Sequence, residues 1–119
     1  MKVTYNDIIR ASGALKKLSE KELPIKQAIA LSRLVKKLNG EIEIFSQEQR
    51  QLVEKYGIIN QETGDFKIPV SKQKEYSDKM TELLTFQVEI ETEKVEINSL
   101  DNIEAAVIMD TELFIDFKA

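Results

Sequence analysis

The feature that most constrains the fold of this chain is an apolar seam in its second quarter that keeps a single heptad register. Successive a and d positions of that register are Ala28, Leu31, Val35, Leu38, Ile42, Phe45, Gln49, Leu52 and Tyr56. All but one are apolar, as in a helix that buries one stripe against a neighbour. The seam therefore predicts one long helix over 24–56. The helix would begin at Pro24, since proline is favoured in a first helical turn, and Gly57 would stop it.

A local signal inside the seam points the other way. The Asn39-Gly40 pair is the strongest short signal for a β-hairpin, and the alternating residues 41–44 after it resemble a strand. A turn at Gly40, however, would leave nothing to hold the later seam residues in phase with the earlier ones. Gly40 also falls at position f, the most exposed place on the helix, where a missing side chain loses no core packing. We favour a continuous helix, with a break at Gly40 as the alternative.

Two further helices are expected. Thr4 and Asp7 have the spacing of a capping box, which predicts the start of a helix over 5–20. The polar connection after it is short, so the long helix folds back on the first and the two form an antiparallel helical hairpin. Ser71 can cap a third helix over 72–86, whose apolar stripe suits packing on the long helix.

Strand patterns occur in the second half of the chain. Apolar residues flank a polar turn that contains Gly64, so 58–68 is predicted to form a small β-hairpin. Residues 86–97 alternate, which fits either one twisted hairpin or one bulged strand. The segment 103–117 suits either a helix over 103–115, which we favour, or short strands. The expected fold is thus α+β and mainly α, in a single domain of 119 residues.

The composition restricts the chemistry, because the chain has no histidine, cysteine or tryptophan. It lacks any side chain with an ordinary pKa near neutrality, any Ser-His or Cys-His nucleophile pair, and any nitrogen or sulfur ligand for zinc. Its four glycines are too scattered for a phosphate-binding loop, and the glutamates at 89–96 lack the pattern of a calcium loop. We therefore expect no catalysis, no cofactor and no metal. No run approaches the roughly 20 apolar residues of a membrane span, so we also expect no membrane partner.

Charge is distributed unevenly along the chain. Residues 1–40 hold nine basic against three acidic side chains, a net +6, and residues 41–119 hold eight basic against eighteen acidic ones, a net −10. We expect the two halves to attract each other within the fold or between subunits. The alternatives are a nucleic-acid face on the basic half and an acidic surface that docks on a basic partner.

Three stretches share their order and spacing with a known family: "ASGALKKLSEKELPIKQAIALSRLVKKLNGEIEIF", "RQLVEKYG" and "LLTFQVEIE" with the later "VEINSLDNIE". In these stretches, which span nearly the whole chain, the sequence resembles small proteins encoded by tailed phages of Gram-positive bacteria. The most distinctive elements are Leu23-Pro24 and the helical run that ends at Gly57. The resemblance implies a phage origin and a cytoplasmic location in the infected host cell. It implies no established activity, so no functional residue is carried over.

Binding to another protein is the function that the sequence favours. Such a non-catalytic module would occupy a surface of a host or phage protein, as an inhibitor or as an assembly accessory. Candidate contact residues lie on the far half of the long helix and in the acidic region after the third helix: Ile44, Phe45, Gln49, Leu52, Val53, Tyr56, Glu89, Glu91 and Glu93. Gln49 is polar either because it is partly exposed or because it sets the register between two long helices. A homo-oligomer with paired long helices is therefore a further hypothesis.

The alternative function is that of a nucleic-acid-binding accessory protein. It would use basic residues of the first two helices: Arg10, Lys16, Lys17, Arg33, Lys36 and Lys37. An overall pI near 5.0 argues against this alternative. So does the scarcity of aromatic residues, since Tyr5 is the only one in the first forty positions.

Overall fold

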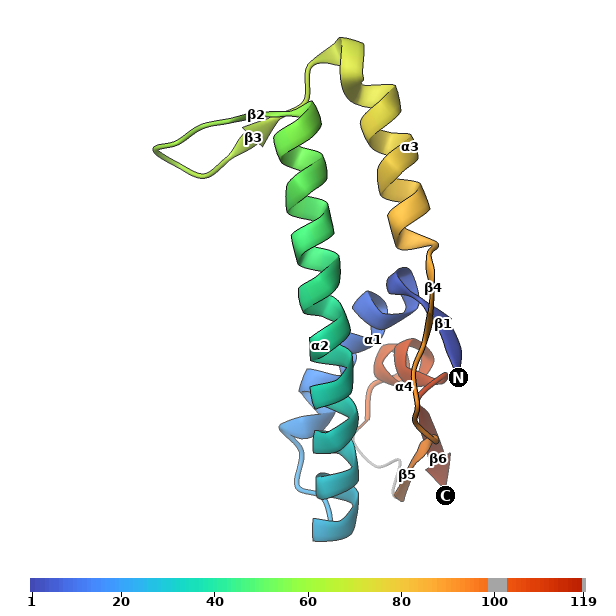
Figure 1. Cartoon of the computed structure of the whole chain (residues 1–119). Helices are drawn as coiled ribbons and strands as arrows, with labels where there is room; N and C mark the ends of the chain where they lie inside the picture. The colour runs from blue at the N-terminus through green and yellow to red at the C-terminus, as the bar shows by residue number, and fades with distance from the viewer. Residues whose placement is uncertain (99–102, 119) are drawn as a thin grey trace.

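The computed structural model describes residues 1–98 and 103–118 and shows a long helix with shorter helices and strands along both of its halves (Figure 1). The helices are α1 (Tyr5–Ser19), α2 (Ile25–Tyr56), α3 (Gln73–Leu84) and α4 (Ala105–Thr111), with a 3-10 turn η1 (Val70–Lys72) before α3. The strands are β1 (Lys2–Thr4), β2 (Ile58–Ile59), β3 (Phe66–Lys67), β4 (Gln87–Glu89), β5 (Val95–Asn98) and β6 (Ile115–Lys118). The predicted class is confirmed: α+β and mainly α, with a helical hairpin and a long second helix.

Helix α2 runs unbroken through the Asn39-Gly40 pair, so the alternative of a turn at Gly40 is wrong. All nine seam positions are buried or half-buried. Gly40 is exposed, and a Cβ added to it would meet no atom within 4 Å. Tertiary packing of the seam therefore overrides the local turn signal. Gly57 ends the helix as predicted, and its N–H donates to the carbonyl of Val53 at 2.8 Å.

Helix α1 begins with the predicted capping box. The N–H of Asp7 donates to Oγ1 of Thr4 at 3.2 Å, and the N–H of Thr4 donates to Oδ2 of Asp7 at 2.9 Å. Two backbone groups that would otherwise lack partners at the helix start are thereby satisfied. The helix then packs against the first half of α2, which completes the helical hairpin.

A compact body is formed by α1, α4, the first half of α2 and the strands β1, β4, β5 and β6 (Figure 1). Its most deeply buried side chains come from three helices, from β5 and from the residue before β6: Ile8, Leu15, Leu18, Leu31, Leu34, Leu38, Ile97, Thr111 and Phe114. Thr111 is the one polar member of this set. Its hydroxyl donates to the carbonyl of Val107 at 2.6 Å, so its burial leaves no donor unpaired.

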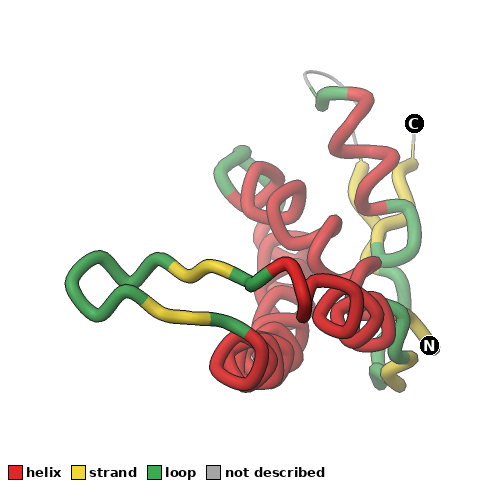
Figure 2. Tube along the Cα trace, turned by 90° about the horizontal axis from the view of Figure 1, so that it is seen from above, coloured by secondary structure: helices red, strands yellow, loops and turns green. Residues whose placement is uncertain are grey.

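The second half of α2 leaves this body and forms an arm with α3, which runs back alongside it (Figure 1). The hairpin β2–β3 and the turn η1 connect the two helices at the far end, and the hairpin projects sideways from the pair (Figure 2). The predicted hairpin and third helix are both confirmed. The predicted cap is wrong, because Ser71 lies inside η1 and the N-cap residue is Lys72, which makes no side-chain capping bond.

The remaining strand pairings differ from the predicted ones. β1 pairs antiparallel with β4, with Val3 opposite Val88, and β5 pairs in parallel with β6, with Ile97 opposite Phe117. Residues 86–97 therefore form neither one hairpin nor one bulged strand. Their two strands take partners from the two ends of the chain.

The C-terminal segment contains both structures that its pattern allowed. Helix α4 ends at Thr111 and β6 begins at Ile115, so the favoured helix over 103–115 is wrong in its last turn. Parallel strands need a crossover connection between them, and α4 lies in the crossover from β5 to β6.

The arm makes the molecule elongated. Its principal extents are 52 × 30 × 23 Å, and its radius of gyration is 17.3 Å, against about 13–14 Å for a compact domain of this length. In the part of the chain that the structure describes, no helix has the length and apolar character needed to cross a membrane.

Candidate functional site

The far half of α2 offers less free surface than its sequence indicates. Phe45, Val53 and Tyr56 are each less than a tenth exposed, because the body and the other elements of the arm cover them. These three side chains hold the fold together and leave no face open to a partner. Ile44 remains exposed on this half, and Gln49 and Leu52 are half-buried. These last three residues of the candidate set can thus contribute only to the margin of a contact surface.

Large exposed apolar side chains lie instead at the far end of the arm. Ile58 is 68% exposed, Phe66 48% and Val70 84%. We call these three residues the arm tip. They were not among the candidate residues, although their hairpin was predicted. The pattern predicts a hairpin, but a two-stranded hairpin cannot bury both of its faces, so Ile58 and Phe66 remain exposed.

Hydrogen bonds within the hairpin fix the backbone that carries the arm tip. The N–H of Asn60 donates to the carbonyl of Asp65 at 2.7 Å, and the N–H of Gly64 donates to the carbonyl of Asn60 at 2.8 Å. Gly64 has a φ of +77°, a left-handed conformation that glycine adopts without strain. The turn is therefore specified by its own sequence.

The base of the arm is anchored by a buried tyrosine. The Tyr5 hydroxyl donates to Oε2 of Glu41 at 3.1 Å, across the junction of α1 and α2. Its ring lies 5.5 Å from the ring of Phe45 and 6.3 Å from the ring of Phe86, centroid to centroid. Burial raises the pKa of Tyr5 above its ordinary value, and the hydrogen bond to Glu41 raises it further. One side chain thus joins α1, the middle of α2 and the end of the arm.

The acidic candidates lie at the edge of the body. Glu89, Glu91 and Glu93 are all exposed, and they follow one another along β4 and the connection to β5. A carboxylate oxygen of Glu89 lies 3.1 Å from the amino group of Met1. Within 1–98 and 103–118, no group of three acidic side chains converges in a way that could hold a metal ion.

The basic candidates divide into two groups. Arg10 and Lys17 on α1 face α4, where they pair with Asp110 at 3.3 Å and Glu104 at 3.7 Å. The predicted attraction between the two halves of the chain is thus present within the fold. These pairs are exposed, so each contributes at most about 1 kcal/mol to stability.

The second basic group lies on the surface of α2. Arg33 and Lys36 are exposed, and the Lys37 ammonium donates to the carbonyl of Glu91 at 2.6 Å. Lys16 is exposed on α1. Of the six residues proposed for nucleic acid, Arg10, Lys17 and Lys37 thus have partners within the fold, and Lys16, Arg33 and Lys36 are exposed.

Comparison with known proteins adds no relative. The chain matches no protein family, no curated protein and no solved structure.

Proposed function

We propose that this chain is a non-catalytic, phage-encoded binding module that occupies a surface of a host or phage protein in the cytoplasm of the infected cell. The observation that carries the proposal is the arm tip, a set of exposed apolar side chains at the end of an arm that leaves the body. Apolar residues gathered on an exposed surface commonly mark a site of protein interaction. The phage origin rests on the sequence resemblance.

The arm tip has the chemistry of a contact core. Full burial of a valine, isoleucine or phenylalanine side chain contributes about 1.5–3 kcal/mol, so Ile58, Phe66 and Val70 could supply most of the affinity of a specific complex. Ile58 pairs with Lys67 and Ile59 pairs with Phe66, so Ile58 and Phe66 lie on opposite faces of the two-stranded hairpin, and a partner would have to enclose the hairpin to bury both.

The arm also holds the tip in a fixed position, so little conformational entropy would be lost on binding. Helices α2 and α3 pack along each other, and Tyr5 fixes their base through Glu41 and two aromatic rings. A group already held in its bound geometry avoids part of the entropic cost of association. A rigid arm that carries its contact residues at the far end suits a blocking or bridging role.

The experiment is affinity capture with three forms of the immobilised protein from infected and uninfected lysates of a Gram-positive host. The first form is the wild type, and the second carries Ile58→Ser, Phe66→Ser and Val70→Ser. The third carries Ile25→Ser and Ile29→Ser, which remove exposed apolar side chains from the opposite end of α2. Thermal melts of the three forms establish that each is folded before capture.

We expect the wild type and the control form to recover the same protein, and the tip variant to lose it. Recovery of no specific protein by the wild type would overturn the proposed function. Equal recovery of that protein by all three forms would show that the arm tip is not the contact surface.

A further inference from the structure

We infer that the cleft between the first half of α2 and the connection from β4 to β5 binds a phosphate-bearing small molecule of nucleotide size. The cleft has a volume of about 470 Å³. Pockets that hold small molecules commonly measure about 300–1,000 Å³. The inference is independent of the proposed function, because the cleft is lined by the first half of α2 and by residues 92–98, whereas the hairpin β2–β3 of the arm tip follows the other end of α2 (Figure 1).

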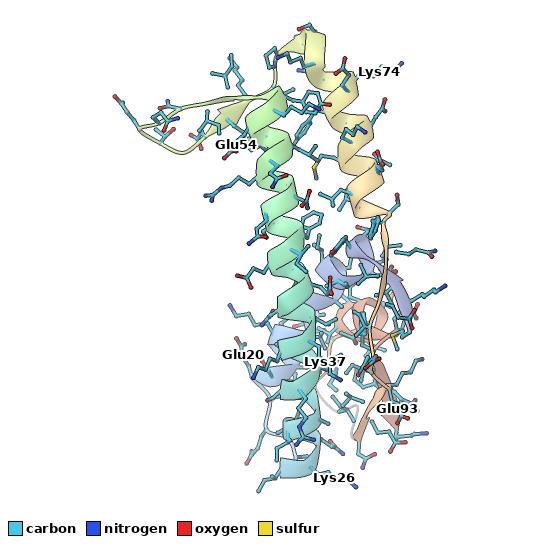
Figure 3. All side chains as sticks on the ribbon, in the orientation of Figure 1. Glu20, Lys26, Lys37, Glu54, Lys74 and Glu93 are labelled. Atoms are coloured by element: carbon cyan, nitrogen blue, oxygen red, sulfur yellow. The ribbon has the colours of Figure 1, made fainter. Side chains whose placement is uncertain are left out.

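Positive charge dominates one wall of this cleft. Lys26, Arg33 and Lys37 line it at positions i, i+7 and i+11 of α2, which place them on one face of the helix. Along the helix axis, the first two are about 10 Å apart and the last two about 6 Å apart. Figure 3 labels Lys26 and Lys37 on this helix and Glu93 on the facing connection. A row of cations of this length suits a ligand with several phosphate groups better than a single small anion.

The opposite wall adds a fourth cation, Lys94, which lies just before β5. Against these four cations the cleft has two carboxylates, those of Glu93 and Glu96, which leaves a net charge of +2 in a protein whose net charge is −4. Among the described residues, neither Lys26 nor Arg33 nor Lys94 lies within 4 Å of a carboxylate oxygen. Their charge is therefore available to an anionic ligand.

The cleft also has the parts needed to hold the rest of such a ligand. Ala30, Leu34 and Val95 form the apolar part of its lining, and Ala30, which is only half-buried, can contact a flat ring. Gln27 also belongs to the lining, and its side-chain oxygen is buried with no hydrogen-bond partner among the described residues. A buried acceptor without a partner is costly, and a ring amino group or a hydroxyl of the ligand would satisfy it.

One wall is fixed to the other before any ligand binds. The Lys37 ammonium donates to the carbonyl of Glu91 at 2.6 Å, which ties the β4–β5 connection to α2. β5 is held in turn by its pairing with β6. The two walls that carry the cations therefore keep their separation, and binding requires only that the ends of long side chains adjust.

The test is isothermal titration calorimetry of the full chain at low ionic strength with three probes: ATP, inorganic tripolyphosphate and a short single-stranded oligonucleotide. We expect ATP to bind at one site, tripolyphosphate to compete with it, and added salt to weaken both. A variant with Lys26→Gln and Arg33→Gln should bind ATP at least about tenfold more weakly. The control, Lys74→Gln with Lys79→Gln on α3, removes the same charge and should leave the affinity unchanged.

A second readout places the ligand. In amide spectra, ATP should shift the side-chain NH₂ signals of Gln27 and leave those of Gln47 and Gln51, which are farther along α2, in place. Binding of the oligonucleotide without ATP or tripolyphosphate would overturn the inference and assign the cations to a nucleic-acid strand. No saturable binding of ATP, or equal weakening by both double variants, would also overturn it.

Discussion

Replacing Gly40 with alanine tests whether α2 is continuous, because the two interpretations of the Asn39-Gly40 pair predict opposite signs. In the structure Gly40 is an exposed residue inside a helix, and an added Cβ would meet no atom within 4 Å. Alanine would therefore be accepted without a clash. It would also lose less backbone entropy than glycine on folding, so Gly40→Ala should stabilise the protein.

The magnitude follows from helix propensity. Glycine is about 0.8–1.0 kcal/mol less favourable than alanine at an exposed position inside a helix. The unfolding entropy of a 119-residue domain near its midpoint is about 250 cal/mol/K, so this gain raises the melting temperature by about 3–4 °C. A hairpin turn at Gly40 would instead require a positive φ there. Alanine would then lower stability by about 1–2 kcal/mol and the melting temperature by about 4–8 °C.

The assay is urea unfolding followed by circular dichroism, with calorimetry for the melting temperature. Two other glycines serve as internal standards. Gly13→Ala should also stabilise, because Gly13 is exposed within α1 and has open space around it. Gly64→Ala should destabilise, because Gly64 has a φ of +77°. If Gly40→Ala behaves like Gly64→Ala, the continuous helix is refuted.

Two further predictions concern the body. Tyr5→Phe removes the hydrogen bond to Glu41 and should lower the free energy of unfolding by about 1 kcal/mol. Because the pKa of Tyr5 is raised above its ordinary 10.0 in the folded state, this contribution is fully present below pH 10 and is lost as pH rises through the folded-state pKa. Urea unfolding of the wild type and Tyr5→Phe from pH 7 to 11 should show the difference between their free energies of unfolding becoming smaller. A difference that grows with pH would contradict the raised pKa of Tyr5. Phe114→Ala should lower the free energy of unfolding by about 3–5 kcal/mol in the same assay, since Phe114 is 1% exposed. Ile25→Ala, at a 79% exposed position, should change it by about 0.5 kcal/mol or less. Similar losses of stability for the two variants would contradict this placement of the core.

Local sequence patterns predicted the helices well, because caps join residues close in sequence and the apolar face that a helix packs recurs with a fixed period. The capping box of Thr4 and Asp7 fixed the start of α1, and the phase of the seam fixed the continuity of α2 against a strong turn signal. Ser71 failed as a cap because Pro69 begins a 3-10 turn first, which leaves Ser71 inside that turn. Side-chain capping preferences thus gave way to the geometry of the preceding turn.

The strand pairings were not predictable by the same means. β4 finds its partner in β1, more than eighty positions away, and β5 finds its partner in β6 beyond α4. Alternation marks a segment as extended but says nothing about a distant partner. Because parallel strands need a crossover, the segment 103–117 contains both the connecting helix α4 and the strand β6 that follows it.

The candidate surfaces were predictable only in part, for a related reason. The seam shows which face of α2 is apolar, and it does not show that other elements of the chain cover Phe45, Val53 and Tyr56. Likewise, the basic residues of α2 were recognisable, but Lys94 joins them only through the fold. Surfaces are made by elements distant in sequence, so their composition becomes visible once the packing is known.

The continuity of α2 supports both the arm and the proposed function, and a distance across it tests that continuity most directly. The chain has no cysteine, so Lys26→Cys and Glu54→Cys, both at exposed sites on α2, can carry spin labels without further changes. A continuous helix separates the two Cα atoms by about 42 Å, at 1.5 Å per residue. We predict one narrow distance distribution near that value in pulsed electron–electron double resonance. A helix that turned back at Gly40 would bring the two sites to about 10 Å, the spacing of packed helices, and the absence of a component near 42 Å would contradict the fold and the arm.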